Sequence, residues 1–466
     1  MALVQIYFLF FGTLGLSIVL YRLSSAHPLS SVPGPYINKI SKFYGSWVSA
    51  SGKRHILQTA LHEQYGSIVR TGPNEVSVLD VAGAKEALRL PRSRFYTQRS
   101  VHGLVNLAGS AHTPRRRRWE RGMNAESLAE YDESLMVTTQ KLLGYLNKSS
   151  GEAVDLCEWL NSFIYDFSVD IAFGEPMETL KEDKSRTAQF FHSIENGFKN
   201  MSVLGQTPWL FAFANKFAPR KHPMFGSELA QRRIARGTTK RDLFYHLIDE
   251  EVPEAKPPMR EVIADCGLLV SVSLTTPSVL SCLFYSMLAQ KQHYEAVKAE
   301  VDARDETLTA VVAANYPFTV ACINEALRLY PPTPTSGQHE VPKGSGGQTI
   351  CGQFLPEGTQ VQVPLYAMHR RPEYFSPRPN DFVPERWLDG SLDLTKDAFM
   401  PFSYGPANCV GRNLAWREML VVTVALMREF EMELPKGFDL DAWKDSFQDF
   451  YIATRPPLPV ILRPRA

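Results

Sequence analysis

The chain has 466 residues, and its 50 lysines and arginines against 49 aspartates and glutamates leave a formal net charge of +1. This near balance argues against a nucleic-acid-binding protein, whose surface usually carries a strong positive charge. The length would allow several domains, but no Gly/Ser linker, charge block or internal repeat divides the chain after residue 36. The six cysteines, at positions 157, 266, 282, 322, 351 and 409, show no paired spacing, so we expect them to be reduced.

The amino-terminal segment is strongly apolar. Residues 3–21 contain no charged side chain, and about 20 apolar residues are enough to cross a bilayer as a helix. A secretory signal peptide is the alternative, but its basic start and small-residue cleavage site are missing. Basic residues follow the apolar run, at Arg22, Lys39 and Lys42, and they place the rest of the chain in the cytoplasm. We therefore predict that residues 1–22 are a single-pass anchor in the endoplasmic reticulum membrane.

Prolines separate this anchor from the rest of the chain, at Pro28, Pro33 and Pro35. We interpret residues 23–35 as a stiff, proline-rich hinge and residues 36–466 as one catalytic domain. Apolar spacing predicts helices over residues 159–173, 227–251, 261–289, 317–329 and 412–428. Turn signals predict one hairpin over residues 69–81 and another over residues 349–363, the latter turning at 356–358. The predicted fold class is mainly α with a minor β-sheet region (α+β).

A single cysteine near the carboxyl end lies in the run FSYGPANCVG, residues 402–411. Gly405 and Pro406 break regular structure, so the backbone can turn tightly and point amide groups at the Cys409 sulfur. Such donors lower the basicity of a thiolate that ligates a metal. A buried structural thiol is the alternative, since free cysteine is among the most buried residue types. Zinc is disfavoured because no CxxC or HxxxH partner lies nearby. Taken alone, the structural thiol would be the simpler interpretation, and one thiolate ligand to haem is favoured only together with the motifs that precede the cysteine.

Two further motifs precede the cysteine run. Glu325 and Arg328 are three residues apart, so they can pair on one face of a helix. Another arginine, Arg386, follows in the run FVPERW, residues 382–387. The order ExxR, PERW and FxxGxxxCxG resembles the cytochrome P450 family of haem-thiolate monooxygenases, fungal microsomal members in particular. The resemblance covers nearly the whole chain from Pro33.

This resemblance implies a cytochrome P450 fold behind an amino-terminal transmembrane helix, with haem b as the cofactor. Cys409 would be the axial iron ligand, and Glu325, Arg328 and Arg386 would form a structural network under the haem. The other residues that the resemblance places at the haem are Phe402, Gly405, Gly411, His112, Arg116, Trp119 and His339. His112 and Arg116 would hold the propionates, with Trp119 as a secondary candidate.

The chain departs from the family pattern at two propionate positions. Ala407 stands two residues before the cysteine, where the family often has arginine, and His339 stands where it usually has another arginine. We therefore expect His112 and Arg116 to carry more of the haem anchoring. His339 would help only when it is protonated or donates a hydrogen bond.

The arginine run HTPRRRRW, residues 112–119, has a second expected role. Some of Arg115, Arg117 and Arg118 are expected to face outward and meet an acidic electron donor. A solvated helix face is the alternative interpretation.

The run SVSLTTP, residues 271–277, resembles the family's oxygen-side motif. Thr275 matches the catalytic threonine, whereas Leu274 stands at the position of the acid and Val272 at that of a glycine. A relay of serine and threonine hydroxyls and water would have to replace the acid. We expect Pro277 to kink the helix and open the groove that glycine would otherwise provide. The alternative is that Thr275 and Thr276 only bond back to the preceding turn.

The loops expected to line the substrate site are largely apolar, at residues 101–107, 203–213, 332–336 and 450–452. Candidate pocket residues are Ser271, Thr335, Ser336 and Tyr451. With a membrane anchor they indicate a lipophilic small molecule, and the resemblance to fungal members suggests secondary metabolism. The expected chemistry is hydroxylation, epoxidation or desaturation, with electrons from NADPH through NADPH-cytochrome P450 reductase and cytochrome b5 as a second donor. Three alternatives stay open: a haem-thiolate rearrangement or dehydration without ordinary oxygen activation, a non-catalytic haem protein, and an anchored scaffold without haem.

Overall fold

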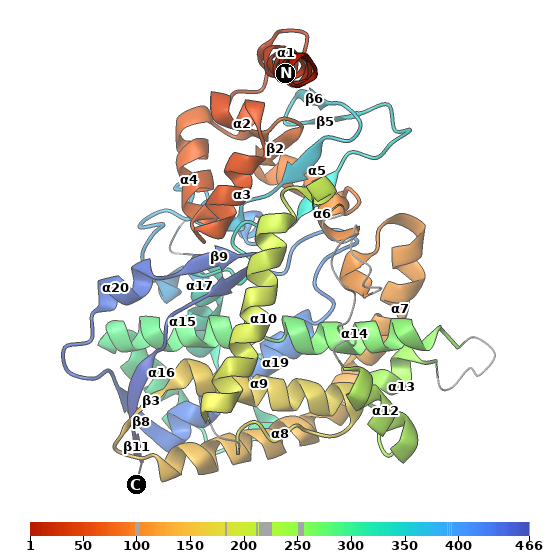
Figure 1. Cartoon of the computed structure of the whole chain (residues 1–466). Helices are drawn as coiled ribbons and strands as arrows, with labels where there is room; N and C mark the ends of the chain where they lie inside the picture. The colour runs from red at the N-terminus through yellow and green to blue at the C-terminus, as the bar shows by residue number, and fades with distance from the viewer. Residues whose placement is uncertain are drawn as a thin grey trace.

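A computed structural model describes residues 1–97, 103–181, 184–210, 213, 226–249, 256–388, 390, 392 and 394–465. Helices form most of this part of the chain, and short strands form small sheets (Figure 1). The largest sheet lies beside the amino-terminal helices, and a body of long helices lies on its other side. This arrangement confirms the prediction of a mainly α protein with a minor β region.

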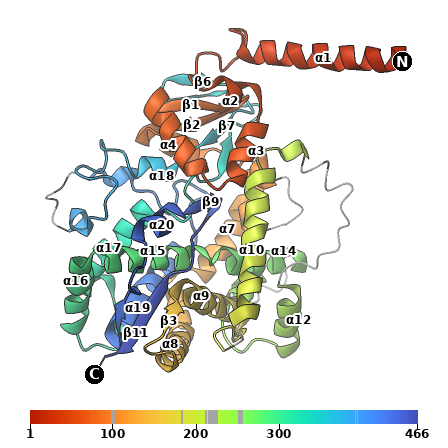
Figure 2. The same cartoon turned by 60° about the vertical axis from the view of Figure 1, so that its left-hand side comes forward.

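The amino-terminal apolar run forms helix α1 (Ala2–Leu23), none of whose residues is buried. Figure 2 shows that α1 extends away from the rest of the molecule. Of the described helices, two are long and apolar enough to cross a membrane, and the second, over Met259–Ala289, is mostly buried in the protein core. Length, composition and exposure of α1 are therefore compatible with the predicted anchor.

The first predicted hairpin is present. A second hairpin is also present, but the position predicted for its turn is wrong. Strands β1 (Ile68–Gly72) and β2 (Glu75–Val78) pair around residues 73–74. The second hairpin pairs β5 (Gln348–Ile350) with β6 (Gln353–Leu355). Its turn is Cys351-Gly352, because both residues adopt positive φ, as tight hairpin turns require.

Residues 356–358, the expected turn, instead lead the chain away from this hairpin into strand β7 (Gln360–Gln362). That strand runs parallel to β2 and antiparallel to β4 (Gln338–Glu340), which completes a sheet of order β1-β2-β7-β4. A second core lies under this sheet and contains Val76, Val361 and Leu88, all nearly inaccessible to solvent.

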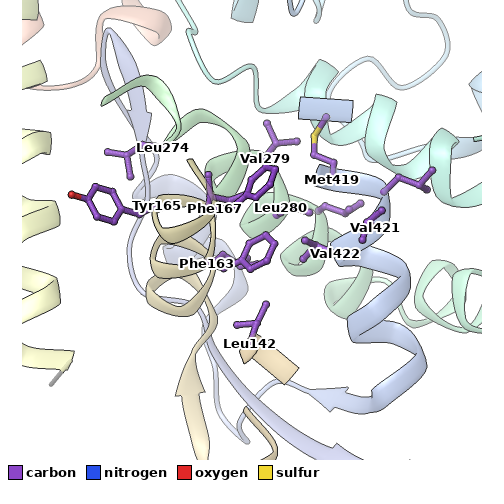
Figure 3. Packing of buried hydrophobic residues seen from close by; sticks show 14 of the residues in the cluster. Leu142, Phe163, Tyr165, Phe167, Leu274, Val279, Leu280, Met419, Val421 and Val422 are labelled. Atoms are coloured by element: carbon purple, nitrogen blue, oxygen red, sulfur yellow. The ribbon is translucent and has the colours of Figure 1, made fainter. Parts of the chain in front are cut away.

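The helical body buries the main core. Five elements supply most of it: α8 (Ala125–Lys148), α9 (Leu156–Phe173), α15 (Thr275–Ala289), α17 (Pro317–Leu329) and α19 (Arg412–Glu429). Figure 3 shows Leu142, Phe163, Phe167, Leu280 and Val422 of this core, which come from α8, α9, α15 and α19. The apolar face of each helix is covered by its neighbours, and this burial is the dominant favourable contribution to folding.

Two predicted long helices are interrupted. The helix predicted over residues 261–289 is split into α14 (Met259–Val272) and α15 at Ser273 and Leu274. Pro277 has no N–H to donate to the Ser273 carbonyl, which instead accepts from Thr276 N at 3.3 Å. The expected kink therefore lies about one turn before the proline.

The pattern over residues 227–251 forms α12 (Ser227–Arg236) and α13 (Leu243–Leu247) instead of one helix. Gly237 has a φ of +78° and ends α12. Glu251, the predicted end, lies outside the described residues.

The remaining helices are α2 (Tyr36–Ile40), α3 (Phe43–Ala50), α4 (Arg54–Tyr65), α5 (Val81–Arg89), α6 (Arg94–Thr97), α7 (His112–Gly122), α10 (Lys184–Leu204), α16 (Lys291–Asp302), α18 (Leu365–Met368) and α20 (Leu440–Asp445). The remaining strands are β3 (Ala153–Asp155), β8 (Phe430–Glu433), β9 (Gln448–Phe450), β10 (Ile452–Thr454) and β11 (Pro459–Pro464). Short 3₁₀ helices include η1 (Leu104–Asn106) and η6 (Pro384–Trp387).

Candidate functional site

The cysteine loop is a closed turn that leads directly into α19. Cys409 N donates a hydrogen bond to Phe402 O at 2.9 Å, so the two ends of the loop are joined. Gly405 has a φ of +77°, and a Cβ at this position would lie 3.0 Å from the Leu88 carbonyl oxygen. Glycine is therefore required here both by the left-handed backbone and by the close approach of α5.

The Cys409 side chain is accessible although protein surrounds it. None of the six cysteines, all of which lie in the described residues, forms a disulfide; Cys409 and Cys351 are exposed, and the other four are buried. Desolvation nevertheless raises the pKa of the Cys409 thiol, while the Gly411 backbone amide and the Arg116 guanidinium act in the opposite direction. The Cys409 residue is thus accessible to solvent, although protein surrounds its thiol.

The space beside this thiol suits a flat cofactor. A Cβ built at Gly411 would meet no atom within 4 Å. One thiolate without any second metal ligand is the donor set of a haem-thiolate centre, and no group of three or more His, Cys, Asp or Glu residues in the described part of the chain could hold a bare metal ion. The residues present therefore fit a haem on Cys409.

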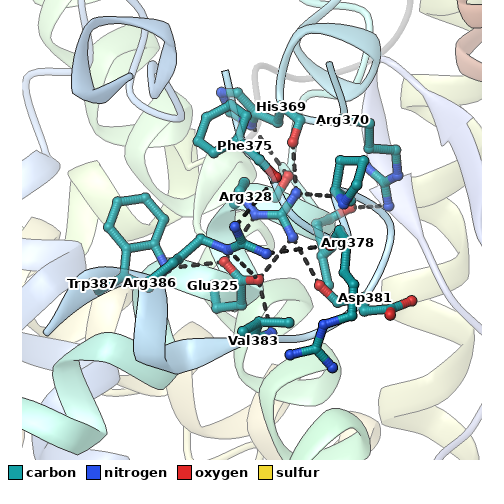
Figure 4. A network of polar contacts seen from close by, with 12 residues as sticks. Glu325, Arg328, His369, Arg370, Phe375, Arg378, Asp381, Val383, Arg386 and Trp387 are labelled. Carbon is teal, nitrogen blue, oxygen red and sulfur yellow. Dashed lines mark hydrogen bonds and ion pairs between the residues drawn. The ribbon is translucent and has the colours of Figure 1, made fainter. Parts of the chain in front are cut away.

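Glu325, Arg328 and Arg386 lie together and are fully buried (Figure 4). Arg328 binds both carboxylate oxygens of Glu325 at 2.7 and 2.8 Å, and Arg386 Nε donates to Glu325 Oε1 at 3.1 Å. This Glu325 network has one side chain that the sequence did not predict, because Trp387 Nε1 also donates to Glu325 at 2.9 Å. The two arginines keep the pKa of the Glu325 carboxyl below its usual value despite its burial.

The network also holds the polypeptide that leads to the cysteine loop. Arg328 donates to the carbonyls of His369, Pro379 and Asp381, and Arg386 donates to those of Phe375, Pro377 and Arg378.

His369 extends the network toward the loop. Burial lowers the pKa of His369 to about 3, so the ring is neutral. Its Nδ1 lies 3.2 Å from the Arg328 carbonyl oxygen, and its Nε2 accepts from Met400 N at 3.2 Å. Met400 lies two residues before Phe402. The Glu325 network thus reaches the start of the ligand loop through His369, which the sequence did not single out.

Helix α7 brings Arg116 to the residue next to Cys409. Arg116 donates to Asn408 O at 2.5 Å and to Asn408 Oδ1 at 2.8 Å, and it pairs with Glu120 at 2.9 Å. Three of its donors therefore already have protein partners.

His112 lies one turn before Arg116 and is buried. Its Nε2 has no hydrogen-bond partner within the described residues. Burial and the charges of Arg92 and Arg116 lower the pKa of His112 to about 4, so the ring is neutral. Trp119 is also buried; burial raises the pKa of Asp265, and the Trp119 indole acts in the opposite direction.

Arg115 is not part of an outward-facing surface. Its guanidinium is buried and binds Asp265 and Glu261, both on α14. Arg118 pairs with Asp249 at 2.7 Å, whereas Arg117 is exposed. Of the three arginines expected near an electron donor, Arg117 is thus the one that faces solvent freely.

The surroundings of His339 do not favour the expected role. Burial lowers its pKa to about 4, so it is not protonated at neutral pH. Its Nδ1 lies 2.7 Å from the Leu90 carbonyl oxygen, which can only accept, so the single ring proton is used there. His339 can therefore offer an anionic group neither a charge nor a hydrogen bond.

The oxygen-side segment lies at the break between α14 and α15. Ser271 Oγ and Ser273 Oγ donate to the carbonyls of Gly267 and Val270 at 2.7 and 2.6 Å, so both bond back to their own helix. Leu274 is buried, and Thr275 begins α15. Thr276 differs from the serines, because its hydroxyl donates to Glu418 of α19 at 2.8 Å.

Glu418 is an acid that the sequence analysis missed. Its only signal was a carboxylate inside the apolar run of α19. Burial raises the pKa of Glu418 to about 8, with Thr276 acting in the opposite direction. The Glu418 carboxyl, which is protonated, is thus held by Thr276. Thr276 lies two residues after Leu274, the position at which the family's acid is missing.

The Glu418 carboxyl should make stability depend on pH. Its folded-state pKa, about 8, exceeds the ordinary value of 4.5, so the folded protein binds more protons between these values. The contribution of Glu418 to the free energy of unfolding should therefore fall as pH rises from 4.5 to 8, by at most about 1.4 kcal/mol per pH unit, whereas buried neutral histidines such as His369 contribute a slope of opposite sign at the acidic end of this range. Glu418→Gln should remove this contribution, which is measured as the difference in slope between the parent and the variant by denaturant titration at pH 5.5, 6.5 and 7.5. Equal slopes in the two proteins would contradict a protonated Glu418.

Two of the four candidate pocket residues come together at β9. Thr335 Oγ1 donates to Asp449 Oδ2 at 2.8 Å, and Tyr451 N donates to Asp449 Oδ1 at 3.1 Å. Ser336 lies next to Thr335 with a φ of +57°, and Ser271 contacts its own helix as described. Residues 101–102, in the first predicted pocket loop, and residues 211–212, in the second, lie outside the described residues.

A family model and several known proteins that resemble this chain all indicate the same family. The family model described as "Cytochrome P450" matches residues 33–460. The cytochrome P450 monooxygenase orf5 of Eupenicillium brefeldianum is 31% identical over 95% of this chain and 92% of its own length. The cytochrome P450 monooxygenase astJ of Aspergillus oryzae is 30% identical over 97% of this chain and 95% of its own. The corresponding values for aba2 of Botryotinia fuckeliana are 31%, 88% and 83%.

Proposed function

This chain belongs to the cytochrome P450 family, whose members hold haem and act as monooxygenases, and we propose that it oxidises a lipophilic small molecule in fungal secondary metabolism. Haem b would bind with Cys409 as its axial ligand. Electrons would come from NADPH through a reductase. The observation that carries this proposal is the accessible Cys409 thiol in a loop joined to both the Glu325 network and Arg116.

When bound, the haem would supply oxygen activation, which thiolate ligation favours. The chain's own contribution on the oxygen side is the control of protons. We propose that Thr275 donates hydrogen bonds there and that Glu418, held by the Thr276 hydroxyl at 2.8 Å, is the proton reserve. A neutral carboxyl with a raised pKa can give up a proton near neutral pH, which the Leu274 side chain cannot do.

The proposed substrate class rests on the anchor and the apolar loops. Helix α1 would hold the protein on the endoplasmic reticulum membrane, with the catalytic domain in the cytoplasm and lipophilic molecules nearby. Thr335 and Tyr451, brought together by Asp449, would contact the substrate. The named relatives are monooxygenases of fungi, which supports a fungal oxidation but does not specify the product.

The function can be tested with microsomes that contain the full chain and a reductase. They would be incubated with NADPH, isotopically labelled dioxygen and a panel of lipophilic metabolites, and the products analysed by mass spectrometry. We expect one labelled oxygen atom in a hydroxylated or epoxidised product. Thr275→Ala should form less product and release more peroxide per NADPH consumed, because proton delivery is impaired. Unchanged coupling would remove Thr275 from the mechanism.

A second candidate function follows from Leu274, which is buried where the acid is expected. The enzyme would then catalyse a rearrangement or dehydration that does not need this proton supply. The same incubation distinguishes the two functions, because this reaction would form product without label and without NADPH. A haem-loaded protein that converts nothing under either condition would contradict both.

A further inference from the structure

Arg92 lies between the two positions at which the family arginines are replaced. Its NH2 group donates to the Ala407 carbonyl at 3.3 Å, and its backbone forms an isolated β-bridge with His339. Ala407 and His339 are the two departures from the family pattern at the propionate positions. One arginine from a different part of the sequence thus contacts both.

The guanidinium of Arg92 also lies close to the haem-anchoring helix. Burial lowers the pKa values of both His112 and His339, and the positive charge of Arg92 adds to this lowering. Its NH1 group donates to the Leu104 carbonyl at 3.0 Å, and its plane lies over the Tyr96 ring at 5.5 Å. These contacts hold the charge at a defined place beside His112.

Nothing in the described part of the chain neutralises this charge. No ion pair of Arg92 occurs there, whereas Arg116 pairs with Glu120 and Arg115 with Asp265 and Glu261. Two of the five guanidinium N–H groups donate to carbonyl oxygens, which leaves donors for another acceptor. Water can solvate a half-buried guanidinium, and the donors that have no protein partner can also bind an anion.

We propose that Arg92 binds a haem propionate and thereby replaces the arginines absent at Ala407 and His339. This inference rests on the proposed function, because it requires the haem to bind at Cys409. The Nε2 of His112, which lacks a partner in the described residues, would carry the proton of the neutral ring and donate it to the same carboxylate. Arginine suits this role because its planar donors match a carboxylate.

The test compares haem with its dimethyl ester, in which both propionates are uncharged. Full-length holoenzyme would be prepared with each porphyrin, and the rate of porphyrin loss to a haem-scavenging protein would be measured. Arg92→Gln should lose haem about tenfold faster or more than the parent, since a hydrogen bond to a charged group contributes about 1.5–3 kcal/mol. The same substitution should hardly change the loss of the dimethyl ester. Arg92→Lys keeps the charge, so it should lose haem at a rate between those of the parent and Arg92→Gln.

Arg89 supplies a matched control. It is exposed, donates to Tyr404 OH at 3.0 Å and lies over the Tyr404 ring, but it has no hydrogen bond to Ala407 or His339. Arg89→Gln should leave both rates unchanged. If Arg92→Gln accelerated the loss of both porphyrins equally, Arg92 would only hold the Leu104 and Ala407 backbone, and unchanged rates would also overturn the proposal. Failure of the parent protein to bind haem would instead refute the proposed function.

Discussion

Replacement of Cys409 by alanine should abolish the haem-thiolate absorption of the reduced, carbon monoxide-bound protein. Loss of residues that merely support metal ligands typically lowers affinity or activity by about 10–100-fold, so loss of the ligand itself should lower turnover by more than this. The polypeptide should still fold, because the loop is closed by the backbone bond from Cys409 N to Phe402 O, which alanine retains. The measurements are the absorption spectrum, the haem content and the turnover of the purified full chain.

Cys351 is the natural control for this experiment. It is the other exposed cysteine and lies in the tight turn between β5 and β6. Cys351→Ala should keep the parent spectrum and turnover. A Cys409→Ala protein with the full haem-thiolate spectrum would show that another group ligates the iron, and the proposed site would then be wrong.

Glu325→Ala should be strongly destabilising. It leaves the guanidinium groups of Arg328 and Arg386 buried without a counter-charge, and removal of one partner from a buried ion pair typically costs about 3–5 kcal/mol. The loss should appear in the free energy of unfolding from denaturant titration. Haem content should fall too, because the network holds the cysteine loop through His369 and Met400.

Glu385 tests whether burial of the ion pair causes the destabilisation expected for Glu325→Ala. It lies in the same PERW motif but is half exposed, and it pairs with His293 at 3.1 Å. Glu385→Gln should therefore change the free energy of unfolding by less than about 1 kcal/mol. Arg386→Lys keeps a positive charge near Glu325 but loses the planar donors of the guanidinium. It therefore separates the effect of the charge from that of the donor geometry. If Glu325→Ala and Glu385→Gln had equal effects, the network would not have the structural role assigned to it.

The helical body shows which features of the fold are local. The helix over residues 317–329 occurs with the predicted ends, and α9 and α19 differ from prediction by a few residues. Apolar periodicity is a local property, so such helices can be recognised without knowledge of their neighbours. The second hairpin was misplaced because two turn signals were present, and the pairing of β7 with β2 depends on residues almost 300 positions apart.

The candidate site also has some features that short sequence patterns determine and others that depend on tertiary contacts. The amino-acid sequence determines the Cys409 loop, the ExxR and PERW motifs and the apolar amino terminus, because each is a short pattern whose chemistry depends on near neighbours. Only the tertiary structure decided that Glu418 meets Thr276 and that Arg92 meets Ala407, contacts that join distant segments. It also decided that His339 is neutral, since burial and the Leu90 carbonyl control its proton. Charge state and hydrogen-bond partners depend on what surrounds a group in space, and short sequence patterns do not record those surroundings.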